Sequence, residues 1–79
     1  MPTIQRFGNC KIAIYAGDHP PPHFHIEGRG WRATVEIETL AVLRGDARRA
    51  QEAMAWALGN VNVLRTEWQR LNRRDDNVQ

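Results

Sequence analysis

The sequence contains very little cysteine and no long apolar run, and each absence excludes a class of protein. Cys10 is the only cysteine of the 79 residues, which excludes an internal disulfide framework and predicts a reducing, cytoplasmic setting. No stretch approaches the roughly 18 apolar residues of a membrane-spanning helix, and the N-terminal residues do not resemble a secretory signal peptide. The length predicts a single domain over residues 1–79, which excludes large multidomain enzymes.

Lysine is also nearly absent. The eleven basic residues are Lys11 and ten arginines, and they exceed the nine acidic residues by a net charge of only +2. The planar guanidinium group of arginine has five donors and suits phosphates, carboxylates and stacked bases. A genome-wide preference for arginine would give the same count, so composition alone does not indicate nucleic-acid binding.

Strand signals fill the first 45 residues. Gly8-Asn9 separates the short apolar segments 3–7 and 10–16 and predicts a hairpin. Gly17-Asp18 and the following prolines end the second segment, because proline has no N–H for a sheet. The proline run predicts a stiff, extended connection to the next strand.

Residues 23–27 and 31–38 alternate apolar and polar side chains, which predicts two half-buried strands. Matching their apolar faces fixes the register, and a two-residue turn at Arg29-Gly30 satisfies it. The three polar pairs expected to face each other are Glu27 with Arg32, His25 with Thr34 and His23 with Glu36.

Helical signals fill the remainder of the chain. Asp46 is a candidate N-cap for a helix over about 46–58, and a second apolar stripe runs over about 61–72. Gly59-Asn60 interrupts the pattern, so two helices or one bent helix are both open, and a frayed tail is expected from about residue 73. The fold class is therefore α+β, with an antiparallel sheet of three to four strands (hairpins in residues 3–43) covered on one face by one or two C-terminal helices.

The chain's three histidines lie within seven residues, in the segment from Asp18 to Glu27. Strand parity places His23 and His25 on one face, with Glu27 in the same row and Glu36 as a neighbour. Paired imidazoles and carboxylates can act as general acid and base, so these four residues are candidate catalytic groups. Histidines on a solvated sheet face often need no function, and whether the protein is an enzyme stays open.

The same segment permits two other chemistries. The candidate contacts to an anion or RNA are Asp18, His19, Lys11, Tyr15 and Arg32. A divalent transition metal is the less favoured alternative, with His19, His23 and His25 as nitrogen ligands and Asp18 or Glu27 as an oxygen ligand. The histidine spacing matches no standard closed zinc motif, so no cofactor is expected.

Several motifs resemble a small bacterial domain family, DUF4160. They are the initial Met-Pro-Thr-Ile, Ile14-Tyr15, the specific string Asp18-His19-Pro20-Pro21-Pro22-His23-Phe24-His25, Ile37-Glu38-Thr39, Trp56 and Trp68. The resemblance implies a short cytoplasmic protein, commonly encoded beside a DUF2442 protein in an arrangement similar to a toxin–antitoxin pair. It supplies no established activity.

The sequence departs from the family pattern in two places. Leu40 stands where members tend to have a turn glycine, and residues 61–64 are apolar where members are richer in glutamate. Val61 and Val63 are therefore candidate residues of a partner-binding surface. Trp56 is a further candidate, because it lies off the apolar stripe of the first helix and could be an exposed anchor for a partner.

Two functions are expected from these observations. The first is a toxin-like module that acts on RNA or the translation machinery through its histidine-bearing sheet face. If it is catalytic, the paired histidines would cleave a phosphodiester without metal. The alternative is a non-catalytic module that binds a DUF2442-like antitoxin, and a homo-oligomer is left open.

Overall fold

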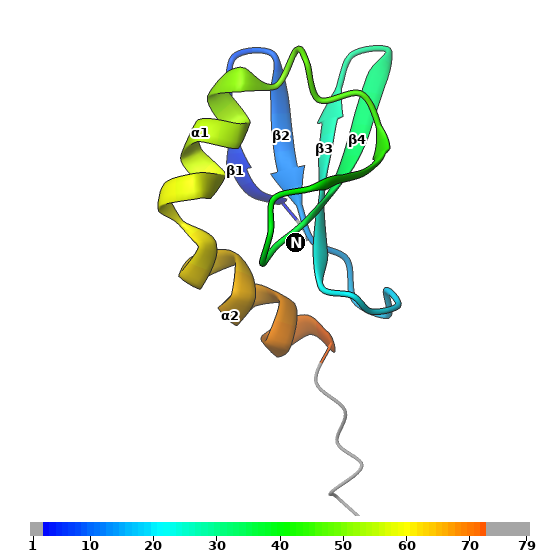
Figure 1. The fold of residues 1–79 in the computed structure, drawn as a ribbon, viewed down its shortest axis with the longest axis vertical. Helices are drawn as coiled ribbons and strands as arrows, with labels where there is room; N and C mark the ends of the chain where they lie inside the picture. Colours follow the sequence, from blue (N-terminus) through cyan, green and yellow to red (C-terminus); the bar gives the residue numbers. More distant parts are fainter. Residues whose placement is uncertain (1–2, 73–79) are drawn as a thin grey trace, which may run out of the picture.

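The computed structural model describes residues 3–72 and has an α+β fold (Figure 1). Five strands precede two helices. Their bounds are β1 Thr3–Arg6, β2 Cys10–Ala13, β3 His23–Gly28, β4 Trp31–Glu36, β5 Val42–Gly45, α1 Gln51–Gly59 and α2 Val61–Asn72. Each strand pairs antiparallel with the next, so the sheet order follows the sequence. The α+β class is confirmed, and the expected frayed tail lies outside the described residues.

The register of β3 and β4 is the predicted one. His23 pairs with Glu36, His25 with Thr34 and Glu27 with Arg32, around a two-residue turn at Arg29-Gly30. Gly30 has a φ of 78°, a conformation that glycine adopts without steric cost. The alternating pattern therefore determined which polar side chains share a face.

Within residues 3–72 the sheet has five strands, and the expectation of three to four is wrong. The hairpins were expected to end at residue 43, but a turn extends to Ala41, where the Glu36 N–H donates to the Ala41 carbonyl at 2.9 Å. Leu40 lies inside this turn with a φ of 61°. The last strand therefore begins at Val42 and continues to Gly45.

The helical region contains two helices, and the first begins at Gln51 instead of near residue 46. Asp46 does not cap it, because its carboxylate accepts the Arg48 N–H at 2.9 Å in a local turn. Asn60 separates the helices. Its side chain donates to the Trp56 carbonyl at 2.8 Å, and its carbonyl accepts from the Leu64 N–H at 3.1 Å.

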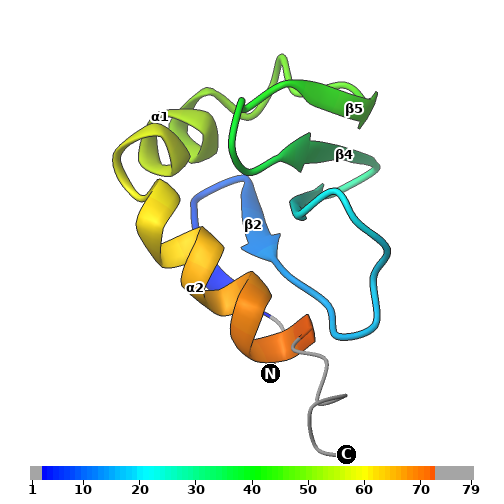
Figure 2. The same ribbon diagram turned by 60° about the horizontal axis from the view of Figure 1, so that its bottom comes forward.

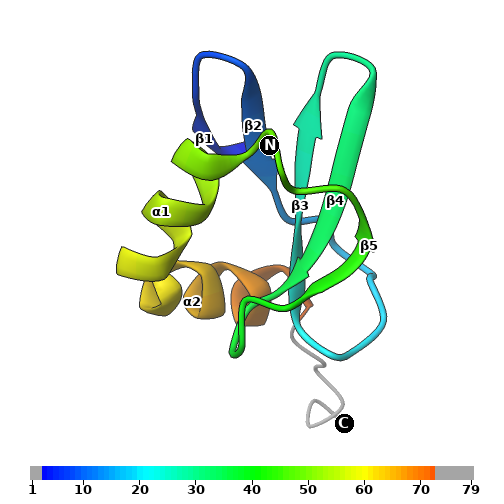
Figure 3. The same ribbon diagram turned by 45° about the horizontal axis from the view of Figure 1, so that its top comes forward.

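Both helices lie on one side of the sheet (Figures 2 and 3). Phe24 and Ile26 of β3 are fully buried there, as their parity predicted. Three alanines of the helical region, Ala50, Ala53 and Ala57, are also fully buried, because their small side chains allow α1 to approach the sheet. The remaining buried side chains are Cys10, Ile12, Ala13, Ile14, Ala33, Val35, Ile37, Leu64 and Trp68.

Neither described helix has the length and apolar composition needed to cross a membrane.

Candidate functional site

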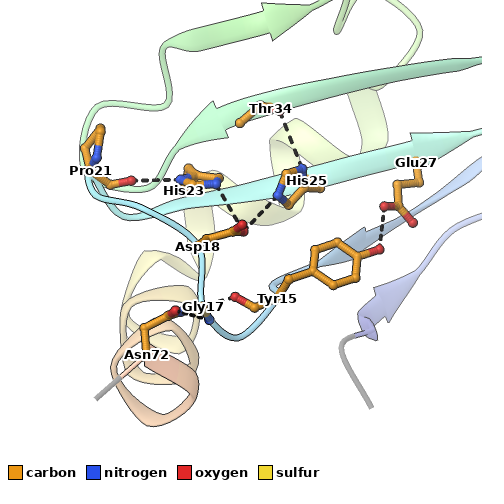
Figure 4. A network of polar contacts seen from close by, with 9 residues as sticks. All are labelled: Tyr15, Gly17, Asp18, Pro21, His23, His25, Glu27, Thr34 and Asn72. Carbon is orange, nitrogen blue, oxygen red and sulfur yellow. Dashed lines mark hydrogen bonds and ion pairs between the residues drawn. The ribbon is translucent and has the colours of Figure 1, made fainter. Parts of the chain in front are cut away.

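Asp18, His23 and His25 converge where the β2–β3 loop meets the start of β3 (Figure 4). The Nε2 atoms of His23 and His25 lie 3.2 and 3.1 Å from the same carboxylate oxygen, Asp18 Oδ2. One atom from each residue can be chosen so that all three lie within 4.8 Å of one another. We call these three residues the Asp–His cluster.

Strand parity positions two members of the cluster, and a tertiary contact positions the third. His23 and His25 share the face of β3 opposite Phe24 and Ile26. The loop that contains Asp18 is bound to the C-terminal end of α2. The Gly17 N–H donates to Asn72 Oδ1 at 2.7 Å, and the Asn72 amide donates to the Tyr15 carbonyl at 3.3 Å (Figure 4). The helix end therefore helps to hold Asp18 above the sheet.

Each imidazole also has a contact at its other ring nitrogen. His23 Nδ1 lies 2.8 Å from the carbonyl oxygen of Pro21, which can only accept, so this nitrogen donates. His25 Nδ1 lies 3.5 Å from the Thr34 hydroxyl. Both nitrogens of each ring are therefore engaged, which leaves none free to transfer a proton to or from a substrate in this arrangement.

The two contacts of the His23 ring need two hydrogen-bond donors, but a neutral imidazole has only one. Because Nδ1 donates to Pro21, a neutral imidazole presents a lone pair at Nε2. That lone pair would face the Asp18 carboxylate, which is itself an acceptor, at 3.2 Å. Two acceptors approach this closely only when a proton or a metal ion lies between the two atoms.

The other predicted catalytic groups lie apart from this point. Glu27 accepts a 2.5 Å hydrogen bond from the Tyr15 hydroxyl, and its other oxygen lies 3.8 Å from Lys11 Nζ. The bond to Glu27 is the largest of several effects, with burial and nearby negative charge, that raise the pKa of Tyr15 to about 12. Glu36 instead accepts from the Thr39 hydroxyl at 3.2 Å.

An open cavity of about 580 Å³ adjoins the cluster. Arg32 and Arg44 are exposed on its wall together with the exposed His19, so His19 is near the cluster without belonging to its converging atoms. Arg44 is a site residue that the sequence analysis did not place there. The pairing of β4 with β5 would have indicated it, because Arg44 lies opposite Thr34 when β5 extends past residue 43.

The residues proposed for a partner surface differ in exposure. Trp56 is half-buried and packs edge-to-face against Phe7, with ring centroids 6.1 Å apart, so it is not an exposed anchor. Val61 is half-buried as well, whereas Val63 is 44% exposed. Leu58 of α1 is 71% exposed.

The comparisons with known proteins agree with the motif at the site. The model of a family described as a domain of unknown function (DUF4160) matches residues 9–69, which include the whole Asp–His cluster. No curated protein and no solved structure matches the chain. Because the match extends over most of its length, the chain belongs to the DUF4160 family.

Proposed function

We propose that this protein is the toxin-like component of a bacterial toxin–antitoxin type pair, and that it binds RNA in the cavity beside the Asp–His cluster. One observation supports the RNA-binding part above all others: two exposed arginines, Arg32 and Arg44, line the same cavity as the cluster. The toxin-like role, a cytoplasmic location and a DUF2442-like antitoxin follow from the family resemblance.

Arg32 and Arg44 differ from several other arginines of the chain in having no ion-pair partner. Within residues 3–72 no carboxylate lies within ion-pair distance of either guanidinium group, whereas Arg48, Arg65 and Arg70 each pair with an acidic side chain. An unpaired guanidinium group can form two parallel hydrogen bonds to a phosphate without first losing a partner. The cavity wall therefore suits a phosphodiester backbone.

Binding receives more support from this geometry than metal-independent cleavage by paired histidines. Acid–base catalysis needs a ring nitrogen within hydrogen-bond distance of a substrate proton. Both histidines instead direct Nε2 at Asp18. RNA, either free or within the translation machinery, is accordingly proposed as a bound target.

The test measures binding of a fluorescent single-stranded RNA by anisotropy across a range of salt concentrations. The double variant Arg32→Gln/Arg44→Gln is expected to bind at least about tenfold more weakly. Its slope of log K against log salt should fall by about 1.4, since each lost phosphate contact removes about 0.7 for single strands. The same variant should lose growth arrest when expressed in cells.

Arg70→Gln is the matched control, because Arg70 is exposed on α2 and pairs with Glu67 at 2.6 Å. It should bind RNA like the wild type. Equal affinity and equal salt slope for the double variant and the wild type would contradict the proposed RNA site.

A second candidate function is non-catalytic capture of the neighbour-encoded protein. It is favoured by the exposed apolar side chains Leu58 and Val63 on the two helices. Size-exclusion chromatography with light scattering on the co-expressed pair should show a complex that Leu58→Ser/Val63→Ser disrupts while RNA binding persists. If the protein stays a monomer in the presence of the neighbour-encoded protein, this alternative is contradicted. Chromatography of the protein by itself would detect any homo-oligomer.

A further inference from the structure

We propose that Asp18, His23 and His25 form a binding site for one divalent transition metal ion of the zinc type. Two imidazole nitrogens and one carboxylate oxygen are a ligand set that zinc accepts. With three protein ligands, the fourth position remains open for water or another small ligand, as in zinc sites that act on substrates. This site does not depend on the proposed RNA binding, because it is argued from different atoms.

The positions of the three ligand atoms agree with such a site. Zinc bonds to nitrogen and oxygen of about 2.0–2.2 Å place neighbouring ligands of a tetrahedron roughly 3.3–3.6 Å apart. The two nitrogen–oxygen separations are 3.1 and 3.2 Å, and all three atoms lie within 4.8 Å of one another. The two nitrogen–oxygen separations are within a few tenths of an ångström of those of a coordinated ion.

The outer contact of His23 is one that metal-binding histidines make. A metal-binding histidine usually donates its other N–H to a carbonyl, carboxylate or water, which fixes the ring orientation. His23 donates from Nδ1 to the Pro21 carbonyl at 2.8 Å, and His25 has its Nδ1 near the Thr34 hydroxyl. The lone pair thereby fixed at His23 Nε2 faces Asp18 Oδ2, and a metal ion between them would be bound by both atoms.

Packing holds the cluster in place and leaves it accessible. The side chains of His23, His25 and Asp18 are 12%, 25% and 29% exposed. The His23 ring lies against Trp68 of α2, with ring centroids 5.1 Å apart. All three cluster residues line the cavity, so an ion can enter from solvent and its open position can reach a ligand in the cavity.

The test uses protein without a polyhistidine tag, stripped with EDTA and titrated with Zn²⁺ by calorimetry in the absence of RNA. The wild type is expected to bind one equivalent. Loss of an outer partner alone lowers metal affinity about 10–100-fold. Asp18→Asn and His25→Gln, which remove a ligand or its charge, should therefore lower the affinity at least about a hundredfold.

His19→Gln is the matched control, since His19 is an exposed histidine of the same loop outside the cluster. It should bind Zn²⁺ like the wild type. Circular dichroism of the metal-free variants separates loss of a ligand from loss of the fold. If a variant unfolds, the wild type still decides the question: imidazole ¹⁵N spectra should show Zn²⁺ shifting the Nε2 signals of His23 and His25 but not those of His19.

Failure to bind one equivalent of Zn²⁺, or an equal loss of affinity in His19→Gln, would overturn the metal site. RNA binding by the arginines is measured separately, so either proposal can fail while the other stands.

Discussion

Neighbouring residues of β3 belong to two faces of the sheet, which are held by different forces. Phe24 and Ile26 are fully buried against a core that both helices complete. His23 and His25, on the opposite face, have side chains that are 12% and 25% exposed, and directed polar contacts orient their rings. The close-packed core loses much stability when a large side chain is removed. The hydrogen bonds fix the positions of the imidazole rings but contribute little net stability. One face of β3 therefore stabilises the fold, and the other face carries the Asp–His cluster's histidines.

The strongest test of this comparison substitutes adjacent residues of β3. Phe24→Ala leaves a cavity in the core and should lower the free energy of unfolding by about 3–5 kcal/mol. His25→Ala removes hydrogen bonds whose net contribution to stability is about 1 kcal/mol, so the free energy of unfolding should fall several-fold less than in Phe24→Ala. Urea denaturation of both variants in EDTA measures the difference, and equal losses of stability would break the distinction between the two faces.

The second test concerns Gly45 at the end of β5, a strand whose residues are all exposed. Gly45 has a φ of 79°, and a Cβ there would collide with the carbonyl oxygen of Arg32. Gly45→Ala should therefore cost about 1–3 kcal/mol through backbone strain despite its exposure. Thermal denaturation would measure this loss.

Gly59→Ala is the matched control for Gly45→Ala. A Cβ at Gly59 meets nothing within 4 Å, and alanine in a helix is more stable than glycine by about 0.5–1 kcal/mol. The two substitutions should therefore change stability in opposite directions. Stabilisation by both would show that β5 is free to move away from β4.

The sequence predicted the two faces of the central hairpin but not the completed site. Alternation from His23 to Glu36 and a two-residue turn permit only one register that buries Phe24 and Ile26, so the shared face of the histidines followed. Asp18 was expected only as a binding or alternative metal-ligand residue, because its place depends on Asn72. That contact joins Gly17 to a residue 55 positions away, and no local pattern encodes it.

Arg44 was missed for a different physical reason. Apolar residues from Leu40 to Leu43 resemble a strand, but the Glu36 N–H donates to the Ala41 carbonyl and the Leu40 N–H donates to the Glu36 carbonyl, which places Leu40 in a turn. The helix start was misjudged in the same way, because Asp46 bonds to Arg48. Local polar and backbone contacts therefore decided boundaries that hydrophobic patterning left open.

The third test follows Tyr15 on the polar face. Tyr15 is the chain's single tyrosine, so phenolate absorbance reports it without overlap. Its hydrogen bond to Glu27, with burial and nearby negative charge, raises its pKa to about 12. The absorbance midpoint in EDTA should therefore lie near pH 12, against about 10 in the unfolded chain.

The sign of the resulting pH dependence follows from proton linkage. The folded protein holds the Tyr15 proton more tightly than the unfolded chain, so this contribution to stability is full below pH 10 and is lost as the pH rises towards 12. Glu27→Gln should lower the pKa of Tyr15, whereas Glu36→Gln, whose carboxylate instead bonds to Thr39, should leave it unchanged. Equal midpoints for the wild type and Glu27→Gln would show that the bond does not hold Tyr15.

The smallest expected effect concerns the turn that sets the start of β5 and, through it, the place of Arg44. Leu40 has a φ of 61°, and the left-handed conformation costs a side-chain-bearing residue about 1–2 kcal/mol. Leu40→Gly and Leu40→Ala remove the same packing. Only the alanine variant bears the conformational cost. The glycine variant has a more flexible unfolded chain, and this flexibility offsets about 0.4–1 kcal/mol of its advantage. The glycine variant should therefore be the more stable of the two by about 0.5–1 kcal/mol in urea denaturation.

At the neighbouring Thr39, whose φ is not positive, the order should reverse and alanine should be the more stable. A greater stability of alanine at both positions would mean that the turn does not hold Leu40 in the left-handed region. The reversal would instead show that the turn holds Leu40 in the left-handed conformation just before β5 begins.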